Sequence, residues 1–539
     1  MKARLSLLAI TTVFAACSKP ADTLPAAPAP APVATAPADH ASAQGIAWKH
    51  AGSDAEVDAA FAQAKTDRKP VFVYWGAKWC PPCNQVKATL FNRMDFIERS
   101  RAFVPVYIDG DSPGAQKLGT RFKVRGYPTM VLFSPDGAEL TRLPGEVDPV
   151  QYTQVLSLGM NAQQRPVKTV LADATHGGAG LTPSDWKLLA FYSWETDEQV
   201  VPKAQAATLL QQLAAACPAD QAATATRLML KALAARDEKA RAKPDAAARE
   251  RVLKLLADPN ASREQMDVLA GSAADIVQAL SAARTPPRQQ LVEAFDAALK
   301  TLQADATLSR ADRFAALEAR VDVARIDQPK DVVKPVLPEA LLADVREQAA
   351  RADREITDGY ERQAVITAAA YLLQQAGLLD ESDQLLEANL AKSHSPYYLM
   401  SELASNAKLR GDKAAALRWS QKAFDTSEGP ATRLQWGASY VGTLLELAPQ
   451  DEARIEQAVQ QLLDEAAAQP NAFYERNARS LQRAGGKLLA WNKGRTHTPV
   501  LQRLQARLDA VCAKLPADDT QRGVCQGLLK PADAPKSAA

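Results

Sequence analysis

The chain has 539 residues, which at roughly 150 residues per domain predicts several domains. Hydrophobic residues make up 47% of it, which excludes a wholly disordered chain. The net charge of +2 provides no basic surplus of the kind that nucleic-acid binding requires, so we expect no nucleic-acid partner. Six cysteines are too few for a disulfide scaffold, so their positions are more informative than their number.

Residues 1–17 have the pattern of an export signal. Lys2 and Arg4 precede an apolar stretch over residues 5–16, which is too short to span a bilayer but has the length of a signal core. No other stretch reaches the length of a transmembrane helix, so we expect membrane contact through a lipid anchor only.

The end of this signal resembles a bacterial lipobox, in which the cysteine after the cleavage site is lipidated. The resemblance implies lipidation of Cys17, although Phe14 stands where leucine is usual. Ordinary signal cleavage is the alternative, and both interpretations export the protein. Ser18 after the anchor favours the outer membrane, on the periplasmic side of the envelope. Residues 18–45 are rich in alanine and proline, which predicts a disordered linker.

Residues 46–160 alternate between helix and strand patterns and predict a compact α/β domain. The expected order of helix, strand, helix, strand, helix, strand, strand and helix implies a mixed sheet with helices on both faces. The expected elements are a helix at 54–66, a strand at 71–75, a helix from the cysteine motif to about 94, a strand at 103–108, a helix at 113–123, strands at 130–133 and 139–143, and a helix at 148–158.

A pair of cysteines follows the first strand of this domain. Cys80 is expected at the turn into a helix, where the partial positive charge of the helix N-terminus stabilises a thiolate. Cys83 lies three residues later and can close a disulfide with it. Cys80 would then attack a substrate disulfide, and Cys83 would resolve the mixed disulfide. Pro81 and Pro82 fit the first helical turn, where no N–H group is needed.

This segment resembles the thioredoxin superfamily, in the branch of exported disulfide-exchange domains. The resemblance rests on Trp79 and the two cysteines after a strand, and on the step from Tyr127 through Pro128 to Thr129 about 45 residues later. It implies a cis peptide bond between Tyr127 and Pro128. It also implies substrate positioning by a set of residues around the dithiol: Trp79, Pro81, Pro82, Tyr127, Pro128 and Thr129.

Two features bear on how the dithiol would work. Where classical thioredoxins carry a buried acid, this chain has Tyr74, so the proton acceptor for Cys83 is open between water and a carboxylate such as Asp109. Lys78 and Lys87 could help to hold a thiolate, or they could be solvated surface lysines.

The cysteine pair could alternatively be half of a zinc site. We expect no metal and no cofactor, because no second such pair and no nearby histidine would complete a ligand set.

The remaining two thirds of the chain have helical periodicity. We expect a linker at 161–182, an α-helical region at 183–360, helical repeats at 361–470, and C-terminal helices and a tail at 471–539. Gly377 and Gly411 are 34 residues apart, and the sequence after Gly411 resembles a tetratricopeptide repeat. The resemblance implies a solenoid with a concave surface for a protein or peptide. A helical body that packs only against itself or against a second subunit is the alternative.

Three further cysteines and several aromatic residues complete the pattern. Cys512 and Cys525 are expected to form a structural disulfide in an oxidising compartment, and Cys217 is left unpaired. We expect the aromatic residues of the repeats to lie in the helical core rather than in a ligand site, namely Tyr397, Tyr398, Trp419 and Trp436.

Two functional hypotheses follow. The first is an exported thiol–disulfide oxidoreductase that exchanges electrons with cysteine pairs of exported proteins, in the reducing direction. Its dithiol would be recharged by a membrane electron donor. The dipeptide Pro81-Pro82 favours this direction, because it carries no histidine or basic group that would strongly stabilise a thiolate. The second hypothesis is a helical-repeat scaffold with an accessory or sensory thioredoxin-like domain.

Overall fold

A computed structural model describes residues 45–143, 145, 148–161, 165–197, 200–236 and 244–530. The export signal, Cys17 and the linker up to residue 44 lie outside the described residues. Residues Gly45–Ala539 cluster as a single unit. Over the described ranges, no helix is long and apolar enough to cross a bilayer.

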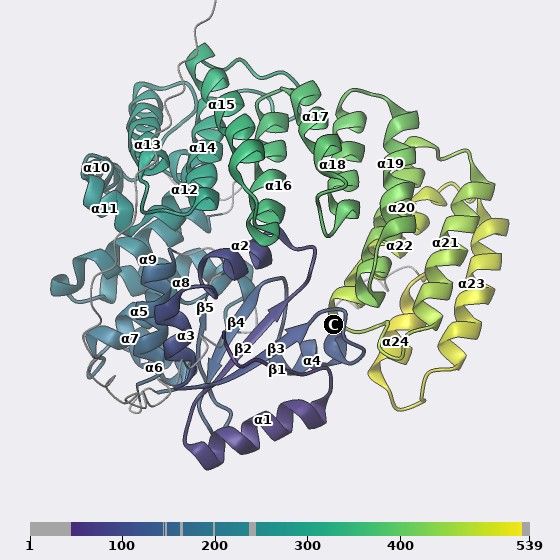
Figure 1. Cartoon of the computed structure of the whole chain (residues 1–539), viewed down its shortest axis with the longest axis horizontal. Coiled ribbons are helices and arrows are strands. Elements are labelled where there is room, and N and C mark those ends of the chain that lie inside the picture. The colour runs from purple at the N-terminus through teal and green to yellow at the C-terminus, as the bar shows by residue number, and fades with distance from the viewer. Residues whose placement is uncertain are drawn as a thin grey trace, which may run out of the picture. The chain divides into compact units, whose positions relative to one another are not determined.

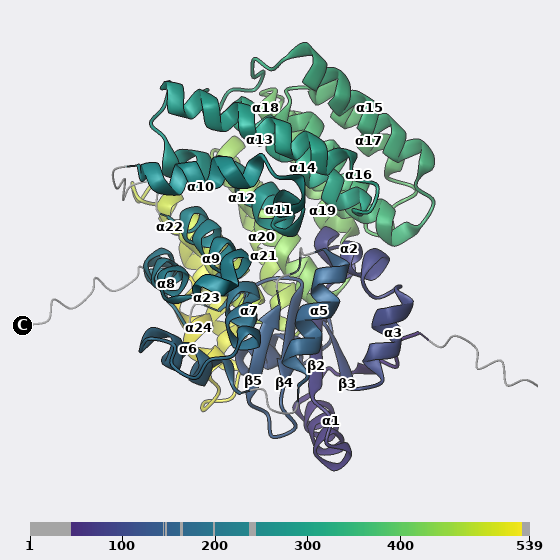
Figure 2. The same cartoon turned by 90° about the vertical axis from the view of Figure 1, so that its left-hand side faces the viewer.

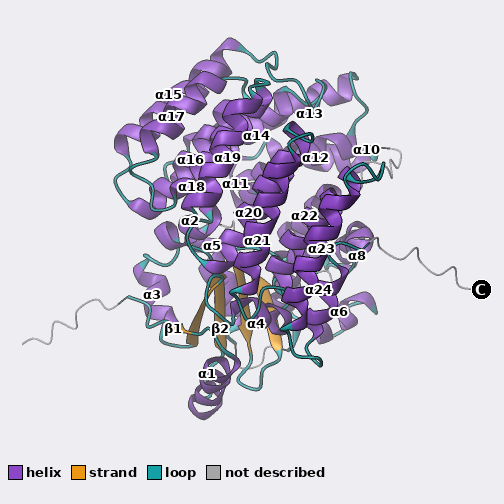
Figure 3. Ribbon diagram, turned by 90° about the vertical axis from the view of Figure 1, so that its right-hand side faces the viewer, coloured by secondary structure: helices purple, strands orange, loops and turns teal. Residues whose placement is uncertain are grey.

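A five-stranded mixed sheet forms the α/β domain. Its strand order is β1-β3-β2-β4-β5, in which β1 and β2 pair parallel with β3 while β4 pairs antiparallel with β2 and β5. This confirms the mixed sheet expected from the sequence. Figure 3 shows the strands side by side in orange, among the helices that make up most of the chain. The strands are β1 (Lys49–His50), β2 (Val71–Gly76), β3 (Val104–Asp109), β4 (Thr129–Phe133) and β5 (Glu139–Leu143).

Helices cover both faces of this sheet because side chains of a strand alternate between its faces. Val71, Val73 and Trp75 of β2 share one core with α1 and α4. Phe72 and Tyr74 point to the opposite core, with α2, α3 and α5. The helices are α1 (Asp54–Asp67), α2 (Pro81–Thr89), α3 (Met94–Ser100), α4 (Ala115–Phe122) and α5 (Pro149–Gly159).

Two elements differ from the expected order. The helix expected to run from the motif to about residue 94 ends at Thr89, and a separate helix, α3, begins at Met94. The chain turns between them so that Phe91 enters the core and packs against Trp48, with ring centroids 5.0 Å apart. The short strand β1 beside Trp48 was also missed, because a two-residue strand has no periodicity to detect.

The first helices after α5 extend the core on the second face of the sheet. They are α6 (Val167–Thr175), α7 (Pro183–Phe191), α8 (Lys203–Ala216) and α9 (Ala222–Ala234), and they share one apolar cluster with Tyr152 of α5 and Leu143 of β5 (Figure 2). The segment expected to be a linker at 161–182 contains α6. Its residues Val167, Val170 and Ala174 recur at helical spacing and are buried against this cluster.

The following helices pack into a continuous region. They are α10 (Ala246–Leu256), α11 (Pro259–Glu264), α12 (Met266–Leu280), α13 (Pro286–Ala304), α14 (Arg310–Ala324), α15 (Glu339–Glu355), α16 (Gly359–Gln375), α17 (Leu379–Asn389), α18 (Pro396–Leu409), α19 (Lys413–Thr426), α20 (Pro430–Leu447) and α21 (Glu452–Ala467). Four alternate helices, α12, α14, α16 and α18, contact one another in that order and form one row, and α16 of that row lies against α2 (Figure 1).

The two glycines that suggested a repeat occupy equivalent turns. Gly377 and Gly411 have φ values of 78° and 79°, in the left-handed region that glycine adopts without strain. The N–H of Gly377 donates to the carbonyl of Gln374, and the N–H of Gly411 donates to the carbonyl of Lys408. These two hydrogen bonds are therefore offset by the same 34 residues. The tetratricopeptide-like character of 361–470 stays a prediction.

The last three helices close the C-terminal end of the described chain. They are α22 (Glu475–Trp491), α23 (Thr498–Ala513) and α24 (Thr520–Gly527). A disulfide joins Cys512 of α23 to Cys525 of α24, with a Cα–Cα separation of 5.7 Å, and both cysteines are buried.

The remaining described cysteine, Cys217, is free and buried. Burial raises the pKa of its thiol to about 11, so the thiol stays protonated and unreactive at neutral pH.

Two adjacent glycines of α22 provide a test of how the segment after α24 docks. A Cβ on Gly485 would lie 2.2 Å from the backbone oxygen of Leu528, whereas a Cβ on Gly486 would meet nothing within 4 Å. We predict that Gly485→Ala lowers the free energy of unfolding by about 1–3 kcal/mol through overpacking. Gly486→Ala should raise it by about 0.5–1 kcal/mol, because alanine is the better helix former. Urea denaturation of both variants tests this, and equal effects would contradict the described docking.

Candidate active site

The cysteine motif lies at the start of α2. Cys80 is the N-cap residue of this helix, and the N–H of Cys83 donates a hydrogen bond to Cys80 Sγ at 3.2 Å. Pro81 and Pro82 fill the first turn, where a missing N–H costs nothing. The two cysteines are joined in a disulfide. A cysteine at a helix N-terminus with a second cysteine one turn on is the arrangement that thiol–disulfide exchange needs.

The second half of the expected site lies beside the motif. The peptide bond between Tyr127 and Pro128 is cis, and the Tyr127 ring lies 6.1 Å from the Trp79 ring, edge to face. Thr129 begins β4, and its hydroxyl donates to the carbonyl of Gly126. The structure therefore brings Tyr127 next to Trp79 although 48 residues separate them in the sequence.

The helical region covers the redox motif. Trp79, Cys80 and Cys83 have only 7%, 2% and 0% of their surfaces exposed, and all three belong to one apolar cluster with side chains of α18, α20 and α22. The Trp79 ring stacks on Tyr398 at 6.0 Å and meets Trp436 edge to face at 5.0 Å. Trp436 is buried, as expected of a core residue, and Tyr398 is partly buried against the same cluster. The core that they contact includes the redox motif.

A chain of hydrogen bonds ties Trp79 to the first turn of α20. Trp79 Nε1 donates to Thr432 Oγ1 at 2.8 Å, and Thr432 Oγ1 donates to the Asp111 carboxylate at 2.6 Å. Asp111 also accepts from the backbone N–H of Thr432 at 2.8 Å. The helix has Gly429 as its N-cap, with no side-chain cap of its own. Asp111 therefore caps α20 from the other side of the interface and complements the positive end of the helix.

Gly429 is required for this contact. Its φ of 95° lies in the left-handed region, and a Cβ at this position would lie 2.4–2.6 Å from the atoms of the Asp111 carboxylate. Any side chain at residue 429 would therefore push Asp111 away from the helix terminus. Burial raises the pKa of Asp111 to about 6, although its hydrogen bonds from Thr432 act in the opposite direction.

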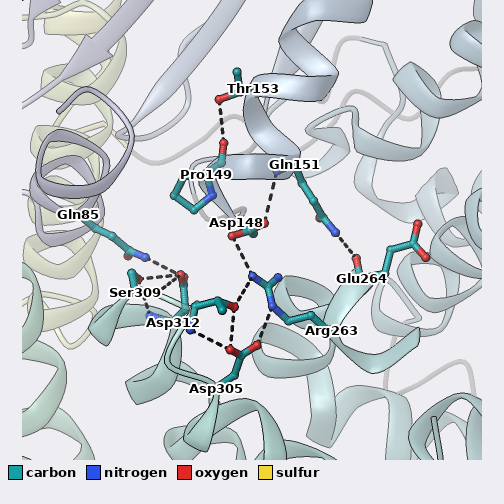
Figure 4. A network of polar contacts seen from close by, with 11 residues as sticks. Gln85, Asp148, Pro149, Gln151, Thr153, Arg263, Glu264, Asp305, Ser309 and Asp312 are labelled. Atoms are coloured by element: carbon teal, nitrogen blue, oxygen red, sulfur yellow. Dashed lines mark hydrogen bonds and ion pairs between the residues drawn. The ribbon is translucent and has the colours of Figure 1, made fainter. Parts of the chain in front are cut away.

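The start of α2 and the N-terminus of α5 are held by a second set of polar contacts. Gln363 of α16 donates to the carbonyl of Trp79 at 3.3 Å. Gln85 of α2 donates to Asp312 of α14 at 3.1 Å, and Arg263 pairs with Asp148, the N-cap of α5, at 3.3 Å (Figure 4). Each of these contacts joins the thioredoxin-like domain to a helix more than 100 residues away in the sequence, so the helical region is bound to the redox site at several points.

The residues behind the motif limit which group can accept a proton from Cys83. Tyr74 is the residue expected where classical thioredoxins carry a buried acid, and burial raises the pKa of its hydroxyl well above its usual value. The hydroxyl therefore stays protonated and cannot act as a base. Asp109 accepts a hydrogen bond from the N–H of Asp111 at 3.0 Å and lies 3.5 Å from the hydroxyl of Tyr107. Asp109 is the last residue of β3, and the proton acceptor for Cys83 stays open between water and a carboxylate such as this one.

The two lysines near the motif differ in their surroundings. Lys78 is exposed and lies 3.5 Å from Glu428 in an ion pair. Lys87 is half-buried between the rings of Tyr107 and Tyr360, at 5.6 and 5.3 Å from their centroids. Burial lowers the pKa of Lys87. A solvated surface lysine is therefore the correct description of Lys78 but not of Lys87, which packs between the sheet and α16.

Sequence reasoning missed the groups that cover the site. Asp111, Thr432 and Arg476 carry no motif, and Arg476 reaches the site from α22 with its guanidinium 5.1 Å from the Trp79 ring centroid. No local signal could identify them, because each acts through a contact between segments more than 300 residues apart.

Among the described residues, no group of three or more His, Cys, Asp or Glu side chains is arranged to hold a metal ion.

The fold and the cysteine pair together define a thiol–disulfide exchange domain of the thioredoxin type. A family model described as a thioredoxin-like domain matches residues 57–159. Thioredoxin H-type of Oryza sativa subsp. indica is 30% identical over 109 residues, which are 20% of this chain and 84% of that protein. The chain therefore belongs to the thioredoxin family through this domain.

Two further relatives match the same part of the chain. Thiol:disulfide interchange protein DsbD 1 of Pseudomonas aeruginosa is 30% identical over 105 residues, and thiol:disulfide interchange protein DsbD of Pseudomonas fluorescens is 30% identical over 106 residues. Each match covers 19% of this chain and 18% of the relative, so the chain spans less than a fifth of the length of these proteins.

The buried carboxyl of Asp111 predicts a pH-dependent stability. Because its pKa is about 6 in the folded chain against an ordinary value of 3.8, the folded state favours the protonated form. The contribution to stability is full below pH 4 and is lost as the pH rises through 6. We predict that the free energy of unfolding of wild type, minus that of Asp111→Asn, falls by about 3 kcal/mol between pH 4 and 7, since one pKa unit is about 1.4 kcal/mol.

Urea denaturation at a series of pH values measures this difference. Asp136→Asn serves as the control, because Asp136 is a surface carboxylate whose side chain is 78% exposed. A difference curve for Asp111→Asn as flat as that of the control would show that the carboxyl is not buried at the interface.

Proposed function

We propose that this protein is an exported thiol–disulfide oxidoreductase that reduces cysteine pairs of other exported proteins through Cys80 and Cys83. The observation that carries the proposal is the position of Cys80 as the N-cap of α2, bonded to Cys83 one turn away. The family membership and the DsbD relatives support thiol–disulfide exchange as the chemistry.

The exchange is balanced in two steps. The Cys80 thiolate attacks one sulfur of the substrate disulfide, the substrate S–S bond breaks, and one substrate thiolate leaves and takes up a proton. Cys83 then loses its proton and attacks Cys80 Sγ, which releases the second substrate thiol and leaves the Cys80–Cys83 disulfide. Two electrons have moved to the substrate, so a dithiol of an electron donor, proposed to lie in the membrane, must reduce the pair again.

Burial of the pair supports the reducing direction. The two cysteines lie in an apolar cluster, and burial disfavours a charged thiolate relative to a neutral disulfide. The residues between them are Pro81 and Pro82, which donate no hydrogen bond to the sulfur. An oxidant needs a strongly stabilised thiolate, so this environment favours a reductant.

The helical region is proposed to select the substrate. The row of α12, α14, α16 and α18 faces α2, which is how the inner helices of a solenoid present a concave surface to a partner. Here the thioredoxin-like domain takes up part of that surface. Because Cys80 is covered, a protein disulfide reaches its sulfur only when the contacts around Trp79 open.

A second candidate function follows from the same covering. A dithiol that is enclosed by helices could report the redox state to a protein bound by those helices, in which case the chain is a scaffold with a sensory thioredoxin-like domain. The burial of Cys80 and Cys83 favours this candidate. The two functions differ in turnover. The dithiol of a sensor changes its redox state without reducing a substrate repeatedly, whereas an oxidoreductase transfers electrons to many substrate molecules.

The test of the proposed function is the midpoint potential of the Cys80–Cys83 pair. We predict a value near −270 mV, in the range of thioredoxin, when the chain is equilibrated in graded thiol/disulfide buffers and trapped thiols are counted by mass. Cys80→Ser is the control that must abolish the transition. A value between about −120 and −180 mV would contradict the reducing direction.

A trapping experiment separates the oxidoreductase from the sensor. In Cys83→Ser the mixed disulfide cannot be resolved, so the variant should retain exported proteins as disulfide-linked complexes that a thiol reductant releases. Catalytic reduction of a protein disulfide by wild type, with a chemical dithiol as donor, completes the test. If the pair titrates but no substrate turns over, the sensor is the correct function.

Export and lipidation are tested in cells. We predict that the full chain is found in the membrane fraction, and that Cys17→Ala releases it into the soluble periplasmic fraction without changing its redox activity. Thr23→Ala in the linker, which leaves both the export signal and Cys17 in place, is the matched control for lipidation. Retention of Cys17→Ala in the membrane fraction would rule out a lipid anchor at this residue.

A further inference from the structure

Two cavities lie on either side of Pro82. The first has a volume of about 560 Å³ and is lined by Pro82, Tyr127 and Pro128 on the redox side. Its charged lining is balanced, with two lysines against two carboxylates, and most of the rest is apolar. The second has a volume of about 400 Å³ and is lined by residues from the start of α2 and from the row α12, α14, α16 and α18. Both cavities share Pro82 and Asp267, so they adjoin.

The second cavity, which we call the acidic chamber, has an excess of negative charge. Five carboxylates and no Lys or Arg are found among the described residues that line it: Asp267, Asp312, Glu318, Asp322 and Glu402. Asp267 and Asp312 have partners from the protein, and Glu318 also interacts with another residue. Asp267 is paired with Arg227, and Asp312 accepts hydrogen bonds from Ser309 and Gln85.

Glu402 differs from these carboxylates. Its side chain makes no hydrogen bond or ion pair with any of the described residues. Burial alone raises its pKa to about 7, although part of its surface remains accessible from the chamber that it lines. A carboxylate that is this enclosed is stabilised strongly by a cation, because attraction between charges is large where water is largely excluded. Its position in the chamber leaves room for such a cation.

Glu402 is also close to the redox motif. It follows Tyr398 by one turn of α18, and Tyr398 stacks on Trp79. The floor of the acidic chamber is formed by Pro81 and Pro82, the two residues between the cysteines. Because both cavities are lined by Pro82, an extended chain that passes over this residue, at about 3.3 Å per residue, can place nearby side chains in the two cavities.

We propose that the acidic chamber is a specificity site that binds a Lys or Arg side chain of the substrate segment whose cysteine is presented to Cys80, with Glu402 as the residue that accepts the cation. The inference rests on the proposed function for the reaction, but it concerns the segment that is bound. The class of substrate is a polypeptide disulfide with a basic residue within a few positions of its cysteine.

Binding and turnover are measured separately to test this. For binding, octapeptides in which serine replaces cysteine are titrated into the oxidised full chain by calorimetry, with Lys, Gln or Glu two positions from the serine. We expect the Lys peptide to bind about tenfold more tightly than the Gln peptide, which is the scale of one charge-assisted hydrogen bond, and the Glu peptide to bind more weakly still. The preference for Lys should decrease at high salt.

Glu402→Gln should reduce the preference for Lys over Gln to less than about twofold. Glu387→Gln on the exposed surface of α17 is the matched control, and it should leave the preference unchanged. With the corresponding disulfide peptides as substrates, Glu402→Gln should raise KM for the Lys peptide by about tenfold and leave kcat unchanged, since binding and not the chemical step is affected.

The outcomes separate this inference from the proposed function. Equal affinity of wild type for the three peptides, or an undiminished preference in Glu402→Gln, overturns the inference even if all three disulfide peptides are reduced. Selective binding of the Lys peptide without reduction of its disulfide form overturns the proposed function and leaves the cation site in place.

Discussion

The contact between Trp79 and the first turn of α20 holds the redox motif against the helical region. The indole N–H reaches Thr432, and Thr432 in turn is held by Asp111 from the loop after β3, so one hydrogen-bonded unit links the motif, the sheet and the helix. A carboxylate from one side caps a helix from the other, which satisfies backbone donors that would otherwise be buried without partners. The contact also requires a glycine at residue 429, because any larger residue would displace Asp111. Together with the contacts that α14 and α16 make with α2, this small set of groups holds the helical region over the cysteines.

This arrangement changes what the thioredoxin-like domain can do. An exposed motif exchanges with any disulfide that reaches it, whereas Cys80 and Cys83 lie under the aromatic residues of α18 and α20. The cost of opening that cover limits reaction with unsuitable partners, and a substrate that binds the helical region can offset the cost by contacts of its own. The cavities on either side of Pro82 lie where such contacts would be made. Selection by the helices and chemistry by the cysteines are therefore parts of one site.

Features that depend on neighbouring residues could be predicted from the sequence, whereas contacts between distant segments could not. The cysteine pair, the strand before it and the step at Pro128 are patterns within short windows, and they led to the mixed sheet and to the chemistry of the domain. The helix expected to run to residue 94 was too long, because the turn that sends Phe91 into the core has no glycine or proline to mark it. The covering of the motif could not be foreseen, since Trp436 has the same helical periodicity whether it packs on another helix or on Trp79. The acidic chamber likewise draws its carboxylates from three helices that are adjacent only in space.

The most direct test of the account is the reactivity of the reduced dithiol in the full chain. The pair is reduced, the small reagent is removed, and the rate of alkylation of Cys80 by iodoacetamide is followed by mass in native buffer and in unfolding urea at the same pH. The account predicts that Cys80 in the native chain reacts at least about 100-fold more slowly than in the unfolded chain, which is the protection that a local opening of a few kcal/mol confers. A native rate equal to or above the unfolded rate would show that the helical region does not cover the redox site, and would contradict the account.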